Sequence, residues 1–387
     1  MQTGRGITNF EIWPEKRLIM AAALAFLLLF SGISRAGDFA VGVDDNSKIY
    51  YASSNGDGTF SNYGQIGWLN GGMSRGATIN DFNNDGHMDF IVGQAISYVG
   101  YYYLFLNDGA GNFNDIRLVG TQSNSGSFSA DMGSGDFNND GNIDFVATGE
   151  HSIAGIYLGD GRGRFSKTEI DLGSRGRGLD TADFDNDGNL DFVRSRYSSG
   201  YVDVYWGDGT GAFQAGNSTR VGDPGNDPYG VVAGDFDNDG FIDVIANSGS
   251  GGDPYFYKGN GDRTFADGVY TESLDFNRHG AFDAFDYNKD GHLDVVAVNY
   301  NGRQMLFFPG NGDATFGASE VLGAVSSNSL GIAAMPRPAP EGVPVPVISP
   351  VSASIAEGES VDFDGSASMD DGSISAWEWT FGDGGTD

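Results

Sequence analysis

The stretch that decides the fold of this chain is Asp81–Asp89, which reads DFNNDGHMD. The same pattern of aspartate, asparagine and glycine returns in four more stretches, Asp136–Asp144, Asp183–Asp191, Asp235–Asp243 and Asp286–Asp294. The five copies begin 47 to 55 residues apart, which indicates a repeat protein. Each copy also carries oxygen-bearing side chains at regular spacing, so the structural repeat and the chemistry coincide.

A second motif accompanies the first: a turn of glycine with aspartate or asparagine that ends in phenylalanine. It occurs at residues 55–60, 107–113, 159–165, 207–213, 259–265 and 310–316. Glycine, asparagine and aspartate tolerate positive φ, so such a turn between apolar runs predicts a β-hairpin. We expect its phenylalanine to open the next strand as a core residue.

Together the two motifs define a unit with four short strands. The first strand enters the aspartate loop and the second leaves it, while the third enters the glycine turn and the fourth follows the phenylalanine. Four antiparallel strands per repeat of about 40–50 residues are typical of a β-propeller blade. The sequence therefore predicts an all-β chain with a six-bladed propeller over residues 37–335, in preference to seven blades.

The two ends of this region predict how the ring closes. Asp38-Phe-Ala-Val-Gly matches Asp89-Phe-Ile-Val-Gly and therefore reads as a second strand, whereas Leu330–Met335 reads as a first strand. Pairing these strands would complete a sixth blade from both ends and would remove the exposed edges of an open array.

The first 36 residues differ from the repeats. Arg5, Lys16 and Arg17 precede an apolar run, Leu18–Phe30, and small residues precede Gly37. This pattern predicts a secretory signal peptide over residues 1–36, with an uncleaved anchor as the alternative, because a membrane span needs about 20 apolar residues. We expect a secreted or cell-surface protein with no membrane span in the mature chain.

The other end of the chain changes character as well. Residues 336–346 are rich in proline and predict a semi-rigid linker. Residues 347–387 alternate apolar and polar side chains, which predicts strands of an Ig-like β-sandwich. A whole sandwich of this kind has about 100 residues, so we expect this domain to be partial.

Composition excludes several function classes. The net charge of −32 argues against general nucleic-acid binding, which requires basic patches. The absence of cysteine excludes disulfides, thiolate metal sites and cysteine nucleophiles. The five aspartate loops hold 17 aspartates, a local excess of negative charge that cations would neutralise.

The aspartate loop has the donor set of a calcium site. Calcium takes six to eight oxygen ligands, and in a loop of this spacing the side chains at positions 1, 3 and 5 turn inward while glycine at position 6 permits the sharp turn. Position 7 then offers its backbone carbonyl, and aspartate at position 9 closes the shell. The candidate ligands are Asp81, Asn83, Asp85, His87, Asp89, Asp136, Asn138, Asp140, Asn142, Asp144, Asp183, Asp185, Asp187, Asn189, Asp191, Asp235, Asp237, Asp239, Phe241, Asp243, Asp286, Asn288, Asp290, His292 and Asp294.

We therefore expect about five structural Ca²⁺ sites. The alternative is a set of aspartate- and asparagine-rich turns with no metal. Five copies with the same four oxygen positions disfavour that alternative, because a turn alone does not require aspartate at position 9. Magnesium is the weaker candidate ion, since it retains several of its waters.

The two motifs resemble FG-GAP/VCBS repeats, the calcium-loop propeller repeats that also form integrin α-subunit heads. The resemblance rests on D-x-[DN]-x-D-G-x-x-D paired with G-[ND]-G-x-x-F, and it covers residues 37–335. It implies a propeller whose loops bind Ca²⁺ on the lower face through positions 1, 3, 5 and 9. Integrin heads have seven blades, whereas the motifs here predict six.

Residues 343–387 resemble the first half of a polycystic-kidney-disease (PKD) domain, which is an Ig-like sandwich. The resemblance is carried by VDFDGSAS from Val361, by Asp371-Gly-Ser-Ile and by WTFGDG from Trp379. It implies an extracellular context rather than a particular activity.

A four-strand meander places its 1–2 loops and 3–4 turns at one end, here called the lower face, and its other connections at the opposite end, the upper face. Calcium on the lower face leaves the upper face for partners. Exposed tyrosine with arginine is typical of binding hot spots. The candidates are Arg75, Tyr98, Tyr101, Arg177, Tyr197, Tyr201, Tyr229, His279 and Tyr300, with His151 nearby. Packing on neighbouring blades is the alternative for each.

The leading functional hypothesis is a secreted or cell-surface calcium-binding propeller that mediates adhesion or binds an extracellular protein or glycan. The alternatives are a lyase-type polysaccharide-active enzyme or its accessory module, and a structural component of a surface layer. Residues 72–76 (GMSRG) match G-x-S-x-G, but they lead into a propeller strand rather than a strand-to-helix turn. No catalytic residue is assigned.

Overall fold

The computed structural model describes residues 39–44, 47–69, 73–123, 129–149, 151–197, 199–225, 228–248, 254–271, 274, 281–299, 303–324 and 329–333. The predicted signal peptide, proline-rich linker and sandwich lie outside these ranges, as do His279 and Tyr300. Within these ranges, every named element of secondary structure is a β-strand. None of these residues belongs to a helix with the length and hydropathy of a membrane span.

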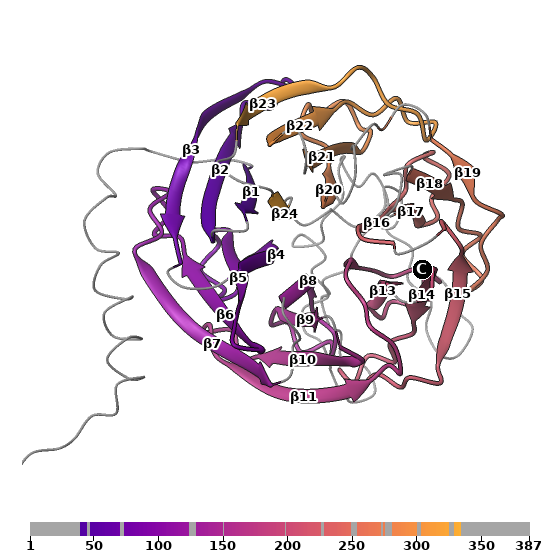
Figure 1. Ribbon diagram of the computed structural model, residues 1–387, viewed down its shortest axis with the longest axis horizontal. Coiled ribbons are helices and arrows are strands. Elements are labelled where there is room, and N and C mark those ends of the chain that lie inside the picture. Colours follow the sequence, from indigo (N-terminus) through magenta and orange to yellow (C-terminus); the bar gives the residue numbers. More distant parts are fainter. Residues whose placement is uncertain are drawn as a thin grey trace, which may run out of the picture. The chain divides into compact units, whose positions relative to one another are not determined.

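The strands form six antiparallel sheets of four strands each, arranged around a centre as the blades of a propeller (Figure 1). Blade 1 contains β4 (Met73–Asn80), β5 (Asp89–Ile96), β6 (Val99–Leu106) and β7 (Asp115–Ser123); blade 2 contains β8 (Ser129–Gly135), β9 (Asp144–Gly149), β10 (Ile153–Gly159) and β11 (Phe165–Asp171); blade 3 contains β12 (Leu179–Ala182), β13 (Asp191–Arg196), β14 (Tyr201–Tyr205) and β15 (Ser218–Gly222). Blade 4 contains β16 (Val231–Gly234), β17 (Asp243–Asn247), β18 (Pro254–Tyr257) and β19 (Val269–Tyr270); blade 5 contains β20 (Phe282–Phe285), β21 (Asp294–Asn299), β22 (Gln304–Phe308) and β23 (Glu320–Ala324).

The sixth blade, here called the closing blade, joins the two ends of the propeller. It contains β24 (Ser329–Ala333), β1 (Phe39–Asp44), β2 (Lys48–Ser54) and β3 (Phe60–Trp68), in that spatial order. β24 pairs antiparallel with β1, with Val41 opposite Ala333 and Gly42 opposite Ile332. This pairing confirms the predicted six-bladed ring and its closure by the first and last strands.

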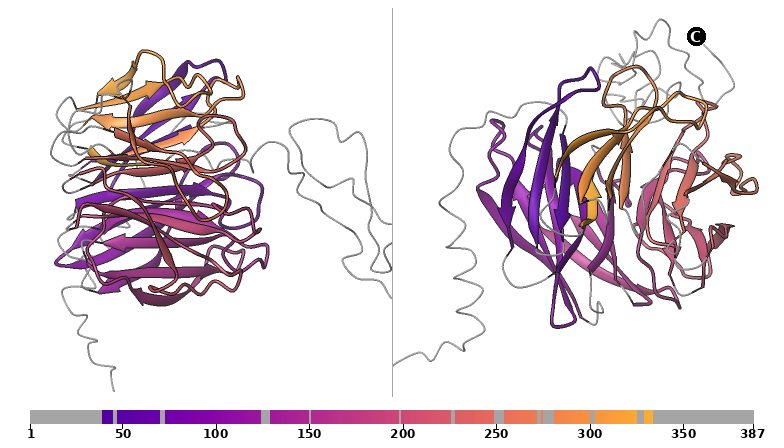
Figure 2. Two further views of the ribbon diagram at one scale, coloured as in Figure 1. Left: turned by 90° about the vertical axis from the view of Figure 1, so that its right-hand side faces the viewer. Right: turned by 45° about the horizontal axis from the view of Figure 1, so that its top comes forward.

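The core of the propeller lies between blades rather than within them. Six clusters of buried apolar side chains occupy the six interfaces between consecutive blades. Seen from the side, neighbouring sheets lie face to face (Figure 2). The second strand of a blade is buried on both faces, which explains its continuous apolar run, such as Phe90–Val92.

The two sequence motifs meet at these interfaces. The aromatic residue at position 2 of each aspartate loop packs against the phenylalanine that ends the glycine turn of the following blade. The pairs are Phe82–Phe165, Phe137–Phe213, Phe184–Phe265, Phe236–Phe316 and Tyr287–Phe60, with ring centroids 5.2–6.0 Å apart. Edge-on aromatic contacts of this kind contribute about 0.5–1.5 kcal/mol beyond the area they bury. Each aspartate loop is thereby fastened to the next blade.

Candidate functional site

The five aspartate loops, here loops 1 to 5 after their blades, share one backbone conformation. In each loop the position-1 carboxylate accepts hydrogen bonds from the backbone N–H groups of positions 5 and 6. In loop 1 these bonds run from Asp85 and Gly86 to Asp81, at 3.1 and 2.7 Å. The position-5 carboxylate accepts from the N–H of position 7. The carboxylates at positions 1 and 5 therefore face the inside of a tight turn.

Two positions of each loop adopt positive φ. Glycine at position 6 was expected to do so, and its φ lies between 82° and 88°. Position 4 also has positive φ, between 55° and 62°, and is occupied by Asn84, Asn139, Asn186, Asn238 and Lys289. Asparagine tolerates this region better than most residues, so its recurrence at position 4 was the available signal.

Position-4 asparagines also link neighbouring loops. Asn84 Nδ2 donates to Asn142 Oδ1 at 3.0 Å, and Asn139 Nδ2 donates to Asn189 Oδ1 at 2.9 Å. Asn238 Nδ2 and His292 Nδ1 lie 2.6 Å apart. The acceptor is each time the position-7 side chain of the next loop, which sequence reasoning had treated only as a backbone ligand. Phe241 occupies position 7 of loop 4 and has no acceptor to offer Asn186.

The ninth-position aspartates have a structural role that sequence reasoning missed. Each is buried, and one oxygen accepts the N–H of position 2 while the other accepts the N–H that opens the glycine turn of the same blade. Asp191, for example, accepts from Phe184 at 3.0 Å and from Gly207 at 2.7 Å. Contrary to the expectation above, the turn itself therefore uses this aspartate, because its side chain joins the loop to the glycine turn.

Burial disfavours the charged form of these five carboxyls. It raises their pKa to about 7 for Asp89, about 6 for Asp144, about 7 for Asp191, about 8 for Asp243 and about 6 for Asp294. Burial also raises the pKa of Asp183 and Asp235, at position 1 of loops 3 and 4. A cation close to such buried carboxyls would stabilise their charged form.

Among the described residues, loops 3 and 4 bring three carboxylates close together. One carboxylate oxygen from each of Asp183, Asp185 and Asp187 lies within 4.8 Å of the others, and the same holds for Asp235, Asp237 and Asp239. In addition, Asp237 Oδ1 is buried without a hydrogen-bond partner among the described residues. A hard divalent cation such as Ca²⁺ prefers this all-oxygen donor set, so the residues present fit such an ion.

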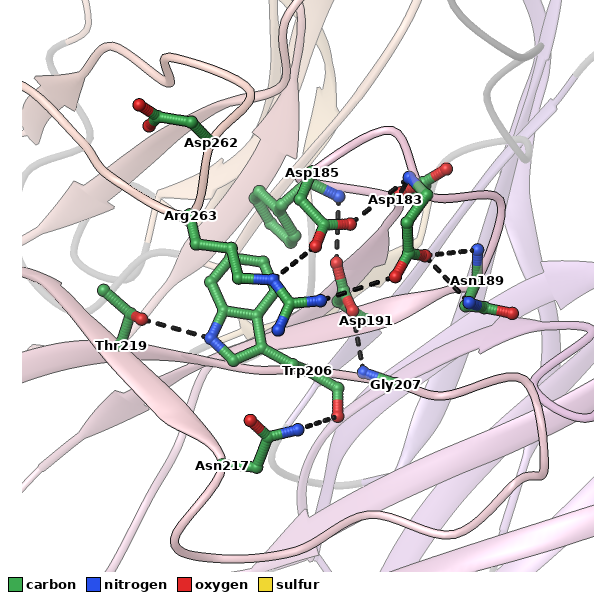
Figure 3. A network of polar contacts seen from close by, with 12 residues as sticks. Asp183, Asp185, Asn189, Asp191, Trp206, Gly207, Asn217, Thr219, Asp262 and Arg263 are labelled. Atoms are coloured by element: carbon green, nitrogen blue, oxygen red, sulfur yellow. Dashed lines mark hydrogen bonds and ion pairs between the residues drawn. The ribbon is translucent and has the colours of Figure 1, made fainter.

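Two basic side chains lie against these clusters. Arg263 Nε contacts Asp185 Oδ2 (Figure 3). The Nη2 of Arg263 also lies 3.4 Å from Asp187 Oδ2. Lys258 Nζ contacts Asp237 Oδ2 and lies 2.6 Å from Asp239 Oδ2. Sequence reasoning assigned no role to either residue.

On the upper face, three of the predicted ligand residues come together in blades 3 and 4. Arg177 precedes β12, Tyr197 follows β13 and Tyr229 precedes β16. The Arg177 guanidinium carbon lies 3.7 Å from the ring centre of Tyr197 and 3.8 Å from that of Tyr229. The two rings meet edge to face at 5.6 Å.

A second arginine–tyrosine pair lies on blade 3. The Arg220 guanidinium carbon is 3.5 Å from the ring centre of Tyr201. Asp203 connects this pair to its neighbours, because it accepts from Arg196 Nη1 at 2.9 Å and lies 3.9 Å from Arg220 Nε. The Arg177–Tyr197–Tyr229 group and the Arg220–Tyr201 pair are together called the upper-face cluster below.

The remaining predicted ligand residues do not join this cluster within the described structure. Tyr98, with 66% of its surface exposed, and Tyr101 belong to the β5–β6 hairpin of blade 1. Arg75 lies in β4, but its side chain is outside the described part of the structure, as are His279 and Tyr300. Ser74 of the G-x-S-x-G match is fully buried within β4, so it is not presented as a nucleophile.

Arg194 holds the connection that leads to Arg177, a role that sequence reasoning missed. It is fully buried, and its Nη2 donates to the carbonyls of His151 and Ser174 at 2.9 and 2.7 Å. Burial lowers its pKa to about 10. The equivalent position in the second strands of blades 1, 2, 4 and 5 is uncharged and holds Val92, Ala147, Ala246 and Ala297. The charged residue in blade 3 is therefore an exception, which was the available signal in the sequence. Arg194 thus anchors the connection that carries Arg177.

Known structures with related architecture include a lectin from Agrocybe aegerita that recognises non-reducing terminal N-acetylglucosamine; it is 17% identical, with a TM-score of 0.48 over 78% of this chain and 86% of that chain. A protein from Lactobacillus plantarum is 13% identical, with a TM-score of 0.46 over 78% and 99%. The V. cholerae biofilm matrix protein Bap1 is 16% identical, with a TM-score of 0.37 over 66% and 41%. Similarity at this level does not transfer function.

Comparison with curated proteins finds no match. Comparison with protein families finds a PKD domain at residues 343–387. It also finds the FG-GAP-like repeat at residues 37–92, 81–147, 136–194, 183–246 and 235–297. These five matches span more than half of the chain, which therefore belongs to the FG-GAP-like repeat family.

Proposed function

We propose that this chain is a calcium-stabilised FG-GAP propeller that binds an extracellular glycan through the upper-face cluster. The observation that carries the proposal is the position of Arg177 between Tyr197 and Tyr229, at the end of the blades opposite the aspartate loops. Adhesion of a cell or matrix to its surroundings is the role that such binding would serve.

The chemistry of the cluster supports a sugar as the ligand. Tyrosine combines an apolar ring with a polar tip, so it both stacks on the apolar face of a sugar and bonds its hydroxyls. Arginine adds a permanent positive charge, which attracts a sugar that carries a carboxylate. A guanidinium already held between two rings loses little conformational entropy on binding, which favours affinity.

Calcium has a structural role in this proposal. Positions 1, 3, 5 and 9 of each loop, with the position-7 carbonyl, would hold the ion, which would offset the repulsion among three or four carboxylates. Each loop contacts the next blade through its position-2 aromatic residue. A cation in the loop therefore stabilises the interface between blades and, through it, the upper face.

The proposal also includes export and a modular chain. Residues 1–36 act as a signal peptide, residues 37–335 form the propeller, residues 336–346 link it onward and residues 347–387 belong to the PKD domain. Calcium is plentiful outside cells, where loops of modest affinity fill.

A glycan array tests the binding role. Calcium-loaded full-length chain should bind a defined set of glycans, and Arg177→Lys should weaken that binding about tenfold or more, because lysine keeps the charge but loses the planar stacking. Tyr270→Ala, which removes an exposed tyrosine from the outer strand β19, is the matched control and should bind normally. Equal binding by wild type, Arg177→Lys and Tyr270→Ala would show that the upper-face cluster is not the binding site. Binding to protein ligands but to no glycan would show that the ligand is not a glycan.

Incubation with polyuronides separates binding from the enzymatic alternative. A binder leaves the polymer intact. Release of unsaturated products that absorb near-ultraviolet light would instead identify a lyase.

A further inference from the structure

The five loops divide into two kinds by the residue at position 3. Loops 1, 2 and 5 carry Asn83, Asn138 and Asn288, whose Nδ2 groups donate to the position-5 carboxylate at 2.9, 3.0 and 2.9 Å. Loops 3 and 4 carry Asp185 and Asp237 instead, so they lack this internal donor and hold four aspartates rather than three. A fourth carboxylate adds repulsion unless a positive charge accompanies it.

In loops 3 and 4 a basic side chain takes the place of the missing donor. Arg263 contacts the carboxylates at positions 3 and 5 of loop 3, and Lys258 contacts the carboxylates at positions 3 and 5 of loop 4. An arginine in one case and a lysine in the other therefore contact the carboxylates at positions 3 and 5, in the two loops that carry a fourth aspartate.

Both basic residues come from one short segment of blade 4. Lys258 directly precedes the glycine turn of residues 259–265, and Arg263 lies within that turn. Lys258 serves the loop of its own blade, whereas Arg263 reaches the loop of the preceding blade. One turn thus supplies positive charge to two adjacent loops.

The equivalent positions of the other blades show that these basic residues are exceptions. At the place of Lys258, the glycine turns of blades 1, 2, 3 and 5 are preceded by Leu106, Leu158, Trp206 and Pro309. Gly111, Gly163, Gly211 and Ala314 stand at the place of Arg263. All five residues at this second place have positive φ, which is 67° at Arg263. A long side chain here costs on the order of 1 kcal/mol in backbone strain, so its ion pairs offset that cost.

Trp206 holds Arg263 in position. The Arg263 guanidinium carbon lies 4.8 Å from the Trp206 ring centre, and the Trp206 indole N–H donates to Thr219 Oγ1 at 3.1 Å (Figure 3). The ring is buried and therefore fixed. The guanidinium is directed at Asp185 by this packing as well as by charge.

We propose that Arg263 and Lys258 are tethered counter-ions that stabilise loops 3 and 4 without metal and compete with Ca²⁺ for the same carboxylates. This inference rests on the proposed calcium binding. It divides the sites into two classes, because position 3 is aspartate in loops 3 and 4 and asparagine in loops 1, 2 and 5. Because the basic side chains compete with Ca²⁺, loops 3 and 4 bind the ion only at a higher calcium concentration than the same loops would need without Arg263 and Lys258.

Calcium titration calorimetry on full-length chain, stripped with EDTA, tests the competition. Arg263→Gln and Lys258→Gln remove the charge, and each should tighten one site about threefold to tenfold, the range expected for partly exposed ion pairs. Arg162→Gln, an exposed charge in the glycine turn of blade 2, is the control and should change nothing. If the titration shows five sites of equal affinity and none of these variants changes them, the inference is overturned, whereas the proposed calcium binding still holds.

Thermal melting in EDTA tests the other half without calcium. Arg263→Gln and Lys258→Gln should each lower the melting midpoint by about 1–3 °C relative to Arg162→Gln, because the carboxylate pair loses its counter-ion. Midpoints equal to that of the control would overturn the counter-ion role. Failure of the wild-type chain to bind any calcium would instead overturn the proposed metal sites, and the competition with them.

Discussion

Asp191 accepts a hydrogen bond of 2.7 Å from the backbone N–H of Gly207, which ties the aspartate loop of blade 3 to the glycine turn of the same blade. Its second oxygen accepts from Phe184 at 3.0 Å. The same pair of bonds recurs at the ninth position of every loop. The two motifs of the repeat are therefore joined by one buried side chain.

Replacing Asp191 by asparagine should destabilise the propeller even in chelator. Asparagine has one acceptor oxygen, so one of the two N–H groups would face an amide donor, at a cost of about 1–3 kcal/mol. Urea denaturation in EDTA measures the change without any contribution from metal binding. Asp208→Asn, at an exposed position of the glycine turn, is the control, and equal midpoints for the two variants would contradict the role of Asp191.

Calcium should raise the melting temperature. At calcium about tenfold to a hundredfold above Kd, each occupied loop adds about 1.4–2.7 kcal/mol to the free energy of unfolding. Magnesium should give a smaller shift, because it retains its waters. Scanning calorimetry with calcium, with magnesium and with EDTA provides the comparison, and identical midpoints in all three would exclude structural calcium.

The aromatic contact between loop and neighbouring blade should carry much of the interface energy. Phe184 is 2% exposed and meets Phe265 edge-on at 6.0 Å. Phe184→Ala should cost about 3–5 kcal/mol, since it leaves a cavity between blades 3 and 4. Phe241→Ala removes a ring that is 37% exposed in the neighbouring loop and should cost far less. Denaturant midpoints of the two variants compare the sites, and equal losses would count against the interface.

The inner strand β8 should make stability depend on pH. Burial raises the pKa of Asp131 well above its ordinary value, and Asp283 and Asp180 raise it further. A carboxyl with a raised pKa in the folded state stabilises the protein at low pH, and this contribution is lost as the pH rises through that pKa. Between about pH 5 and pH 8, wild type should therefore lose more stability than Asp131→Asn.

Urea denaturation at both pH values measures this difference. Asp171→Asn is the control, because the bond from Ser152 lowers the pKa of the exposed Asp171, which stays ionised throughout the interval. Parallel pH profiles for wild type and Asp131→Asn would show that Asp131 does not titrate there.

Local chemistry explains why the fold could be predicted in advance. Asp81, Gly86 and Phe82 each have a requirement that can be recognised without coordinates: an inward oxygen, a positive φ and a buried ring. Their fivefold recurrence indicated the period, and the matching strands at Asp38 and Leu330 indicated the closure. Arg177, Tyr197 and Tyr229 were chosen by residue type and loop position, which are also local features.

Non-local contacts account for what was missed. Arg263 and Asp185 are 78 residues apart, and no periodic pattern predicts that a turn of blade 4 reaches a loop of blade 3. Arg194 and Lys258 could have been noticed as charged residues where sister repeats are uncharged, but their partners are visible only in the fold. The dual hydrogen bonding of Asp191 was hidden because a metal alone accounted for the residue.

The closing blade also sets the order of events during synthesis. Among the described strands β1 is the first to be made and its partner β24 is the last, and Val41 and Ala333 pair across almost the whole propeller. Until the ribosome has released residue 333, β1 presents an unpaired edge on which another nascent chain could align. Ring closure is thus a late step of high contact order, and chaperones that cover β-edges would act during that interval.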